Sequence, residues 1–181
     1  MSIIDKIVAA VAPPESDEER KEARDRARTA AANCEWLQTV LDHHLKIEQA
    51  FVTAKTANDA GSRRTALKNL GTVLTGHAIA EECVIYPAMV KHGEKAAATM
   101  AYTEQSGAKM EMGLLDGLDP NSEDWRDKLE HIEGAVQHHV FEEEGTWFPE
   151  LARAASPADN AMISQRYNEE YGRYVGAGAV I

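Results

Sequence analysis

The fold of this chain is decided by an eleven-residue stretch that occurs twice. HAIAEECVIYP at residues 77–87 matches HVFEEEGTWFP at residues 139–149. Each copy holds a histidine, a glutamate four residues later, a second glutamate beside it, an aromatic residue at the ninth step and a proline at the tenth. Residues four apart lie on one face of an α-helix, one above the other. Each copy is therefore expected to be helical, with its histidine and first glutamate on the same face.

The same pattern interrupts three apolar stripes. Stripes of helical spacing run through residues 37–51, 67–84 and 129–147, and each is broken by a histidine followed four residues later by a glutamate. These pairs are His44/Glu48, His77/Glu81 and His139/Glu143. A buried carboxylate is costly unless it is paired or binds a metal. The stripes therefore predict either a metal site or satisfied His–Glu hydrogen-bond pairs inside the protein.

Two of these assignments have competing registers. His138/Glu142 has the same spacing as the pair one residue further on, but it would move the proline one position late and leave the apolar stripe. The register that begins at His139 is therefore preferred. On the first stripe, His43 lies on an apolar series of its own and competes with His44.

The rest of the chain favours helix almost throughout, because Ala, Glu, Leu and Lys dominate. Turn and capping residues divide the chain into long helices expected over residues 31–58, 62–93, 94–115, 122–155 and 156–176. Four long helices with short connections predict an all-α, antiparallel up-down-up-down four-helix bundle. The predicted organisation is an N-terminal helical extension (1–30), the bundle (31–155), and a C-terminal helix and tail (156–181).

The extension itself is expected in two parts. A short amphipathic helix is predicted over residues 1–14, ended by Pro13-Pro14. Ser16 and Glu19 form a capping-box pattern that opens a charged stretch through Arg28. This stretch is polar all round and is interpreted as a solvated helix.

Antiparallel pairing predicts which residues share a level in the bundle. A turn centred near residues 60–61 places His44 level with His77. A turn near Gly93 sets Glu81 opposite Gln105, and a third turn near residues 120–121 brings His139 within about one turn of Gln105. The candidate residues are therefore expected at similar heights.

Composition limits the partners. The 181 residues carry a formal charge of −11 at pH 7, which disfavours nucleic acid and anionic membranes and suits a cation. No segment has the apolar length of a membrane span. Two cysteines, Cys34 and Cys83, make neither a disulfide framework nor a zinc pattern, and we interpret them as reduced thiols of a cytoplasmic protein.

Imidazole and carboxylate ligands together suit iron, manganese or zinc, and a dinuclear site needs carboxylates that can bridge. The Glu-x-x-His pattern of ferritin-type sites and the His-Glu-x-x-His pattern of zinc proteases do not occur in the sequence.

The doubled motif, together with His44-x-x-Ile47, resembles the hemerythrin-like HHE cation-binding domain over about residues 36–151. The resemblance implies a four-helix bundle that holds two non-haem irons, bridged by the two motif glutamates and capped by histidines. It also implies binding of, or reaction with, oxygen, peroxide or nitric oxide. The ligands carried over residue by residue are His44, His77, Glu81, His139 and Glu143.

One departure concerns the third helix, where the family usually offers a histidine and this chain has Tyr102-Thr103-Glu104-Gln105. Gln105 is a poor iron ligand, so one iron is expected to be bound through Glu104 or Glu48 or to be open to water. Glu48 fits equally a ligand, an outer hydrogen-bond acceptor and the ion-pair partner of a lysine.

The remaining polar and aromatic residues receive structural interpretations. His131 and His138 share another face and are expected between helices or at the surface, with an outer role at the site as the alternative. Three further glutamates are expected in solvent, namely Glu82, Glu142 and Glu144. Tyr86, Trp147 and Phe148 are expected in the core rather than as redox relays, and Pro87 and Pro149 are expected to redirect or end their helices.

Two functions follow. One is a di-iron protein that binds or reacts with a small diatomic or peroxide ligand, with peroxide decomposition as the candidate enzyme activity. The other is a non-catalytic metal-binding or iron- and redox-sensing bundle. A plain helical protein with buried His–Glu pairs is the third interpretation.

Overall fold

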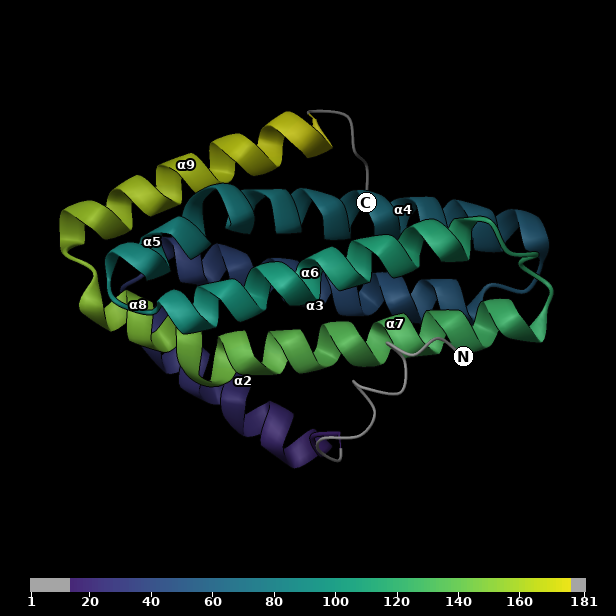
Figure 1. The fold of residues 1–181 in the computed structure, drawn as a ribbon, viewed down its shortest axis with the longest axis horizontal. Helices are drawn as coiled ribbons and strands as arrows, with labels where there is room; N and C mark the ends of the chain where they lie inside the picture. The colour runs from purple at the N-terminus through teal and green to yellow at the C-terminus, as the bar shows by residue number, and fades with distance from the viewer. Residues whose placement is uncertain (1–13, 177–181) are drawn as a thin grey trace.

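The computed structural model describes residues 14–176, and all regular structure within that range is helical (Figure 1). The α-helices are α2 (Asp17–Ala31), α3 (Glu35–Thr56), α4 (Ala60–Ala80), α5 (Tyr86–Lys91), α6 (Lys95–Asp116), α7 (Glu123–Glu142), α8 (Phe148–Ala154) and α9 (Pro157–Val175). Two π-helical turns, η1 (Glu81–Ile85) and η2 (Glu143–Trp147), join α4 to α5 and α7 to α8. Residues 1–13, which carry most of the short helix predicted over 1–14, lie outside the described range.

The long helices α3, α4, α6 and α7 lie along the long axis of the molecule and form a helical bundle (Figure 1). α3 packs against α4 and α7, and α6 packs against the same two helices. Helix α9 covers α4 and α3, whereas α2 lies against α3 and the turn η2. No helix within residues 14–176 is long and apolar enough to cross a membrane.

The apolar core has two parts. One cluster contains Trp36 and Phe148 and lies around the short helices α5 and α8. The other contains Phe51 and Trp125 and lies toward the opposite end of the bundle. On α3, Leu41 belongs to the first cluster and Ile47 to the second, so the polar residues between them lie where the clusters meet.

The sequence signals for helix ends are largely confirmed. Ser16 and Glu19 form the predicted capping box, with Ser16 Oγ accepting from the Glu19 backbone N–H. Ser156 caps α9, with Pro157 at its first turn. Gly93 has φ +99°, a conformation that favours glycine, and it follows the end of α5.

One expectation about the helices is wrong, and one of the two alternatives for the prolines is excluded. The charged stretch is not solvated all round, because Ala23, Ala27 and Ala31 of α2 are buried against the bundle. These alanines form one apolar face of α2, and the mean hydropathy of the whole stretch does not reveal such a face. The prolines Pro87 and Pro149 do not end their helices, since each lies in the first turn of an α-helix that continues from a π-helical turn.

A hydrogen bond between the start of α3 and the start of α9 gives a stability prediction. Trp36 Nε1 donates to Asn160 Oδ1 at 2.7 Å, and the Trp36 side chain is fully buried. Asn160→Ala leaves the indole N–H without that acceptor, and we expect a loss of about 1–3 kcal/mol in the free energy of unfolding. Denaturant unfolding measures it. Asn168→Ala, at an exposed position of the same helix, is the control, and equal effects of the two substitutions would contradict the assignment.

Candidate metal centre

The two copies of the repeated stretch build the same unusual backbone. In η1 the Tyr86 N–H donates to the Glu81 carbonyl, and in η2 the Phe148 N–H donates to the Glu143 carbonyl. Both bonds span five residues, as in a π-helix. Each π-helical turn starts at the motif glutamate and ends one residue before the phenolic or phenyl side chain of the repeat.

The prolines explain why the π-helical turns form at these places. In an α-helix the residue at position 87 would donate to the carbonyl of Cys83, and the residue at 149 to that of Gly145. Proline has no N–H, so neither bond can form. The helix accommodates the loss by the wider turn, and the recurrence of proline six residues after the glutamate is the sequence signal for it.

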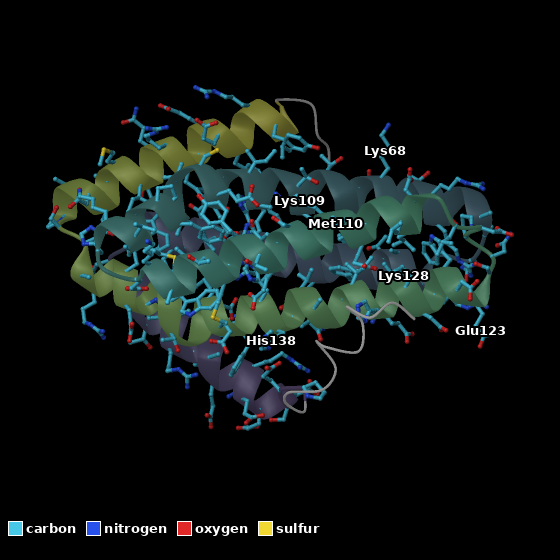
Figure 2. All side chains as sticks on the ribbon, viewed as in Figure 1. Lys68, Lys109, Met110, Glu123, Lys128 and His138 are labelled. Atoms are coloured by element: carbon cyan, nitrogen blue, oxygen red, sulfur yellow. The ribbon has the colours of Figure 1, made fainter. Side chains whose placement is uncertain are left out.

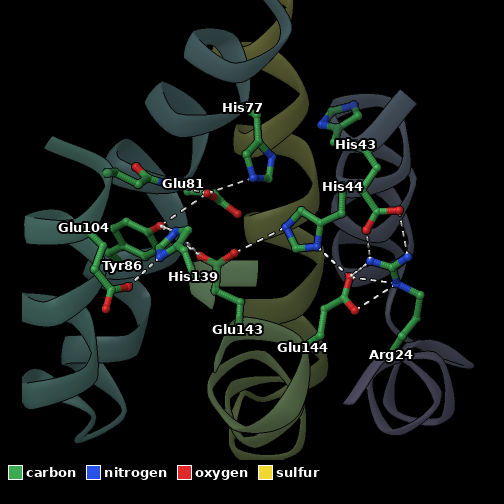
Figure 3. A network of polar contacts seen from close by, with 12 residues as sticks. Arg24, His43, His44, His77, Glu81, Tyr86, Glu104, His139, Glu143 and Glu144 are labelled. Atoms are coloured by element: carbon green, nitrogen blue, oxygen red, sulfur yellow. Dashed lines mark hydrogen bonds and ion pairs between the residues drawn. The ribbon is translucent and has the colours of Figure 1, made fainter. Parts of the chain in front are cut away.

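Four of the predicted ligands converge between the helices (Figure 3). His44 comes from α3, His77 from the last turn of α4, and Glu81 and Glu143 from the first positions of η1 and η2. Each offers one ligand atom, and these atoms all lie within 4.8 Å of one another. His77 Nε2 is 3.1 Å from Glu81 Oε2, and His44 Nε2 is 3.3 Å from Glu143 Oε2.

The fifth predicted ligand, His139, lies at the edge of this group. Its Nε2 is 3.1 Å from Glu143 Oε1 and 3.1 Å from the Tyr86 hydroxyl. Its Nδ1 pairs with Glu104 Oε2 at 2.8 Å. The ring is thus held from the far side by Glu104 and presents Nε2 toward the carboxylate of Glu143.

Three polar atoms at the centre have no hydrogen-bond partner among the described residues. His44, Glu81 and Glu143 have no exposed surface, and His77 is 2% exposed. His44 Nε2, Glu81 Oε1 and Glu143 Oε2 are buried and make no hydrogen bond to the described residues. Buried polar groups in native proteins are nearly always satisfied, and an unsatisfied group points to a missing water or ion. This donor set therefore fits a metal.

The charges at the centre are unbalanced as well. Burial raises the pKa of Glu81 well above its usual value, and the neighbouring charge of Glu143 raises it further. Burial acts in the same direction on Glu143, but the charge and hydrogen bond of His139 and the contact with His44 lower its pKa below the usual range. A cation between the two carboxylates would favour the ionised form of both.

The pKa values of the buried histidines shift in opposite directions. Burial acts to lower the pKa of His44, but its contacts with Glu143 and Glu144 raise that pKa to about 10. His139 is raised to about 10 in the same way, because the charge of Glu143 and the hydrogen bond to Glu104 outweigh burial. Burial and the charge of His44 lower the pKa of His77 well below its usual value.

The third helix supplies the two residues expected at this level. Gln105 is buried and its Nε2 donates to Glu81 Oε2 at 2.6 Å, so the predicted opposition of these residues is confirmed. Glu104 pairs with His139 instead of entering the group of four. Glu48 is not in the group either. Its carboxylate pairs with Arg24 at 2.5 Å, so its ion-pair partner is an arginine and not a lysine.

The other histidines lie outside the centre. His43 is buried, with Nδ1 2.9 Å from the Tyr167 hydroxyl and its ring stacked on Tyr171. Burial lowers its pKa to about 3. His131 is exposed. His138 is exposed too, reaching away from the bundle to pair with Glu15 Oε1 at 2.6 Å (Figure 2).

One expectation about the repeat is wrong. Glu144 was expected in solvent but is 1% exposed, and it accepts from His44 Nδ1 at 2.8 Å. Its repeat mate Glu82 does reach the edge of the molecule, where it pairs with Lys109. Tyr86 is a core residue as predicted, and its buried hydroxyl in addition donates to Glu143 Oε1 at 2.9 Å. Trp147 and Phe148 are core residues as predicted.

Sequence reasoning also missed residues outside the repeat. Arg24 of α2 holds the Glu144 carboxylate through Nε at 2.9 Å and through Nη2 at 3.1 Å. Tyr167 of α9 places its hydroxyl 3.0 Å from His77 Nδ1. Their helices flank the bundle, and nothing in their spacing indicates which side chains face the centre.

Comparison with known proteins agrees with this centre. A curated relative, a DNA nickase of Nostoc sp. (strain PCC 7120 / SAG 25.82 / UTEX 2576), is 28% identical over 108 residues, which is 60% of this chain and 30% of the nickase. The chain thus spans less than a third of that protein. The family model described as the hemerythrin HHE cation binding domain matches residues 38–151, which include all five predicted ligands. This chain therefore belongs to the hemerythrin HHE cation-binding domain family.

Proposed function

We propose that this protein holds two iron ions between its helices and binds or reacts with a small oxidant, namely oxygen, peroxide or nitric oxide. Manganese and zinc are the alternative metals. The proposed ligands are His44, His77, Glu81, His139 and Glu143. The observation that carries the proposal is the buried group of His44, His77, Glu81 and Glu143, whose ligand atoms lie within 4.8 Å of one another. Three of these side chains have a polar atom without a hydrogen-bond partner in the described residues.

The donor set favours a dinuclear centre. Glu81 and Glu143 start equivalent π-helical turns on two helices, and each has one oxygen without a partner in the described residues. Carboxylates with a free oxygen can bridge two ions, and imidazoles at either side suit iron. Bound iron would supply Lewis acidity and one-electron redox chemistry at this point.

The surrounding residues hold the donors and protons in place. Glu104 fixes the His139 ring through Nδ1, while Gln105 donates to Glu81. The Tyr86 hydroxyl donates to Glu143 and lies 3.3 Å from Glu81 Oε2, so it keeps a proton between the two carboxylates. Burial and both carboxylates raise the pKa of Tyr86 well above its usual value, so this proton is retained at neutral pH.

The space beside the centre supports a small ligand. A cavity of about 20 Å³ is lined by His77, Gln105 and His139 together with apolar side chains such as Leu74 and Val136. This volume is close to that needed by a single water molecule. A diatomic molecule is of similar size to this space.

A non-catalytic role in metal binding or iron sensing is the second candidate. Gln105 occupies the position on α6 that faces Glu81 and offers an amide instead of a third-helix histidine.

We also infer an up-down-up-down order for α3, α4, α6 and α7, supported by the short connections between them. A cytoplasmic location is likewise an inference, supported by the two free cysteines.

Nicking of DNA is not carried over from the Nostoc relative. This chain matches 30% of that protein, and its net charge of −11 opposes binding to a polyanion.

Metal content tests the proposal directly. Protein purified from iron-replete cells is expected to contain about two iron ions per chain, to absorb visible light and to change its spectrum on addition of peroxide. His77→Ala should weaken metal binding by more than about a hundredfold, since even outer partners of ligands contribute ten- to a hundredfold. Iron analysis and optical titration measure both effects.

His131→Ala is the matched control, because His131 is exposed and lies outside the centre. Absence of iron in the wild-type protein, with no rebinding of Fe²⁺, would refute the di-iron proposal. Metal-dependent melting without any reaction with peroxide, oxygen or nitric oxide would favour the non-catalytic role.

Metal binding should also release protons. His44 and His139 both have a pKa of about 10 in the metal-free protein, so a cation must displace a proton from each at neutral pH. Affinity is therefore expected to rise between pH 6.5 and 8, by about tenfold per pH unit for each proton displaced. Titration calorimetry with Zn²⁺ in buffers of different ionisation enthalpy measures the release. An affinity that does not change with pH would contradict this assignment.

A further inference from the structure

Two helices that lie outside the family-matched segment 38–151 reach the metal centre. Helix α2 precedes that segment, and α9 follows it. Each contributes one polar side chain that contacts the outer side of a proposed ligand or of the carboxylate that holds it (Figure 3 shows Arg24).

The contact from α2 runs through Glu144. Arg24 donates through Nε and Nη2 to both Glu144 oxygens, at distances between 2.9 and 3.2 Å, and through Nη1 and Nη2 to Glu48. Glu144 in turn accepts from His44 Nδ1 at 2.8 Å. This bond fixes the ring so that Nε2 faces the centre, 3.3 Å from Glu143. The guanidinium also balances the charge of Glu144, which is almost fully buried.

The contact from α9 is direct. The Tyr167 hydroxyl is fully buried and lies 3.0 Å from His77 Nδ1 and 2.9 Å from His43 Nδ1. A tyrosine hydroxyl can accept one hydrogen bond and donate another. With His77 donating from Nδ1, Tyr167 donates to His43, and His77 Nε2 is left facing Glu81.

Close packing keeps α9 in this place. A Cβ at Gly76, the residue before His77, would lie 2.5 Å from Val175 Cγ2 of α9. Glycine at this position therefore allows the two helices to approach closely where the proposed ligand lies. The same helix α9 carries Tyr167, whose hydroxyl contacts His77.

We propose that Arg24 and Tyr167 are positioning residues for the metal centre: Arg24 fixes the carboxylate that orients His44, and Tyr167 orients His77. This inference rests on the proposed function. It assigns the flanking helices a role in the affinity of the centre, because partners on the outer nitrogen of a ligand histidine set its tautomer and direction.

The chain offers a matched control for each residue. Arg28, one turn after Arg24 on α2, is 58% exposed and forms an ion pair with Asp25. Arg28→Met therefore makes the same side-chain change at a position that does not contact Glu144 within the described residues. Tyr171, one turn after Tyr167 on α9, has a buried hydroxyl without a hydrogen-bond partner in the described residues. Tyr171→Phe therefore removes the same atom without loosening His77.

The experiment compares Zn²⁺ affinity and histidine ¹⁵N NMR spectra of the full chain. Arg24→Met and Tyr167→Phe should each weaken Zn²⁺ binding by about tenfold or more, whereas Arg28→Met and Tyr171→Phe should leave it unchanged. Arg24→Lys should restore part of the affinity, because lysine keeps the charge but not the paired contact. Melting curves followed by circular dichroism confirm that each variant is folded.

The NMR spectra of the metal-free protein separate positioning from general loosening. The ring resonances of His44 should shift in Arg24→Met and those of His77 in Tyr167→Phe, each without the other. Shifts of both histidines in both variants, or unchanged affinity and unchanged rings, would overturn the inference. If Arg24→Met does not fold, Glu144→Gln tests the same contact with side-chain volume retained.

The two proposals can fail separately. If the wild-type protein binds neither Zn²⁺ nor Fe²⁺, the proposed function is wrong, while the metal-free spectra still decide whether Arg24 and Tyr167 hold the two rings. If metal binds tightly and both positioning variants bind it equally well, only the inference in this subsection is wrong.

Discussion

The structure depends on the burial of two carboxylates, Glu81 and Glu143, inside a helical bundle. Neither has any exposed surface, and their ligand atoms lie within 4.8 Å of each other. Like charges so close in a medium of low dielectric repel strongly. Gln105, Tyr86 and the imidazoles contact these carboxylates, and each contact offsets part of the cost of burying them. The remaining unpaired atoms are where a cation would complete the balance.

The repeated stretch shows how one local solution serves two helices. A proline six residues after each glutamate removes a backbone donor, and the helix widens into a π-helical turn that begins at that glutamate. The second glutamate of the repeat has different surroundings in the two copies. Glu82 pairs with Lys109 near the surface, whereas Glu144 is buried between His44 and Arg24. The same position of the repeat therefore forms an ion pair near the surface in one copy and contacts a proposed metal ligand in the other.

The flanking helices α2 and α9 pack against the bundle and also contribute side chains to the surroundings of the metal centre. Helix α2 presents a face of small residues that lets Arg24 approach the bundle, and α9 approaches α4 closely at Gly76. In both cases a close backbone approach brings one polar side chain to the outer nitrogen of a histidine or to its carboxylate partner. The proposed ligands come from α3, α4, α7 and the two π-helical turns, and the flanking helices fix the orientation of two of the imidazole rings.

The sequence alone determined the helical class, the helix starts at Ser16 and Ser156, and four of the residues that gather at the centre. Spacing along a helix reports directly on which side chains share a face. It also placed Gln105 opposite Glu81. Only the tertiary structure decided that Glu144 faces inward, that the Tyr86 hydroxyl reaches Glu143, and that Glu104 contacts His139. It also decided that Arg24 reaches Glu144 and that Tyr167 reaches His77. Periodicity describes one helix at a time, whereas these contacts depend on how closely and at what angle neighbouring helices approach, which is settled by packing between residues far apart in the chain.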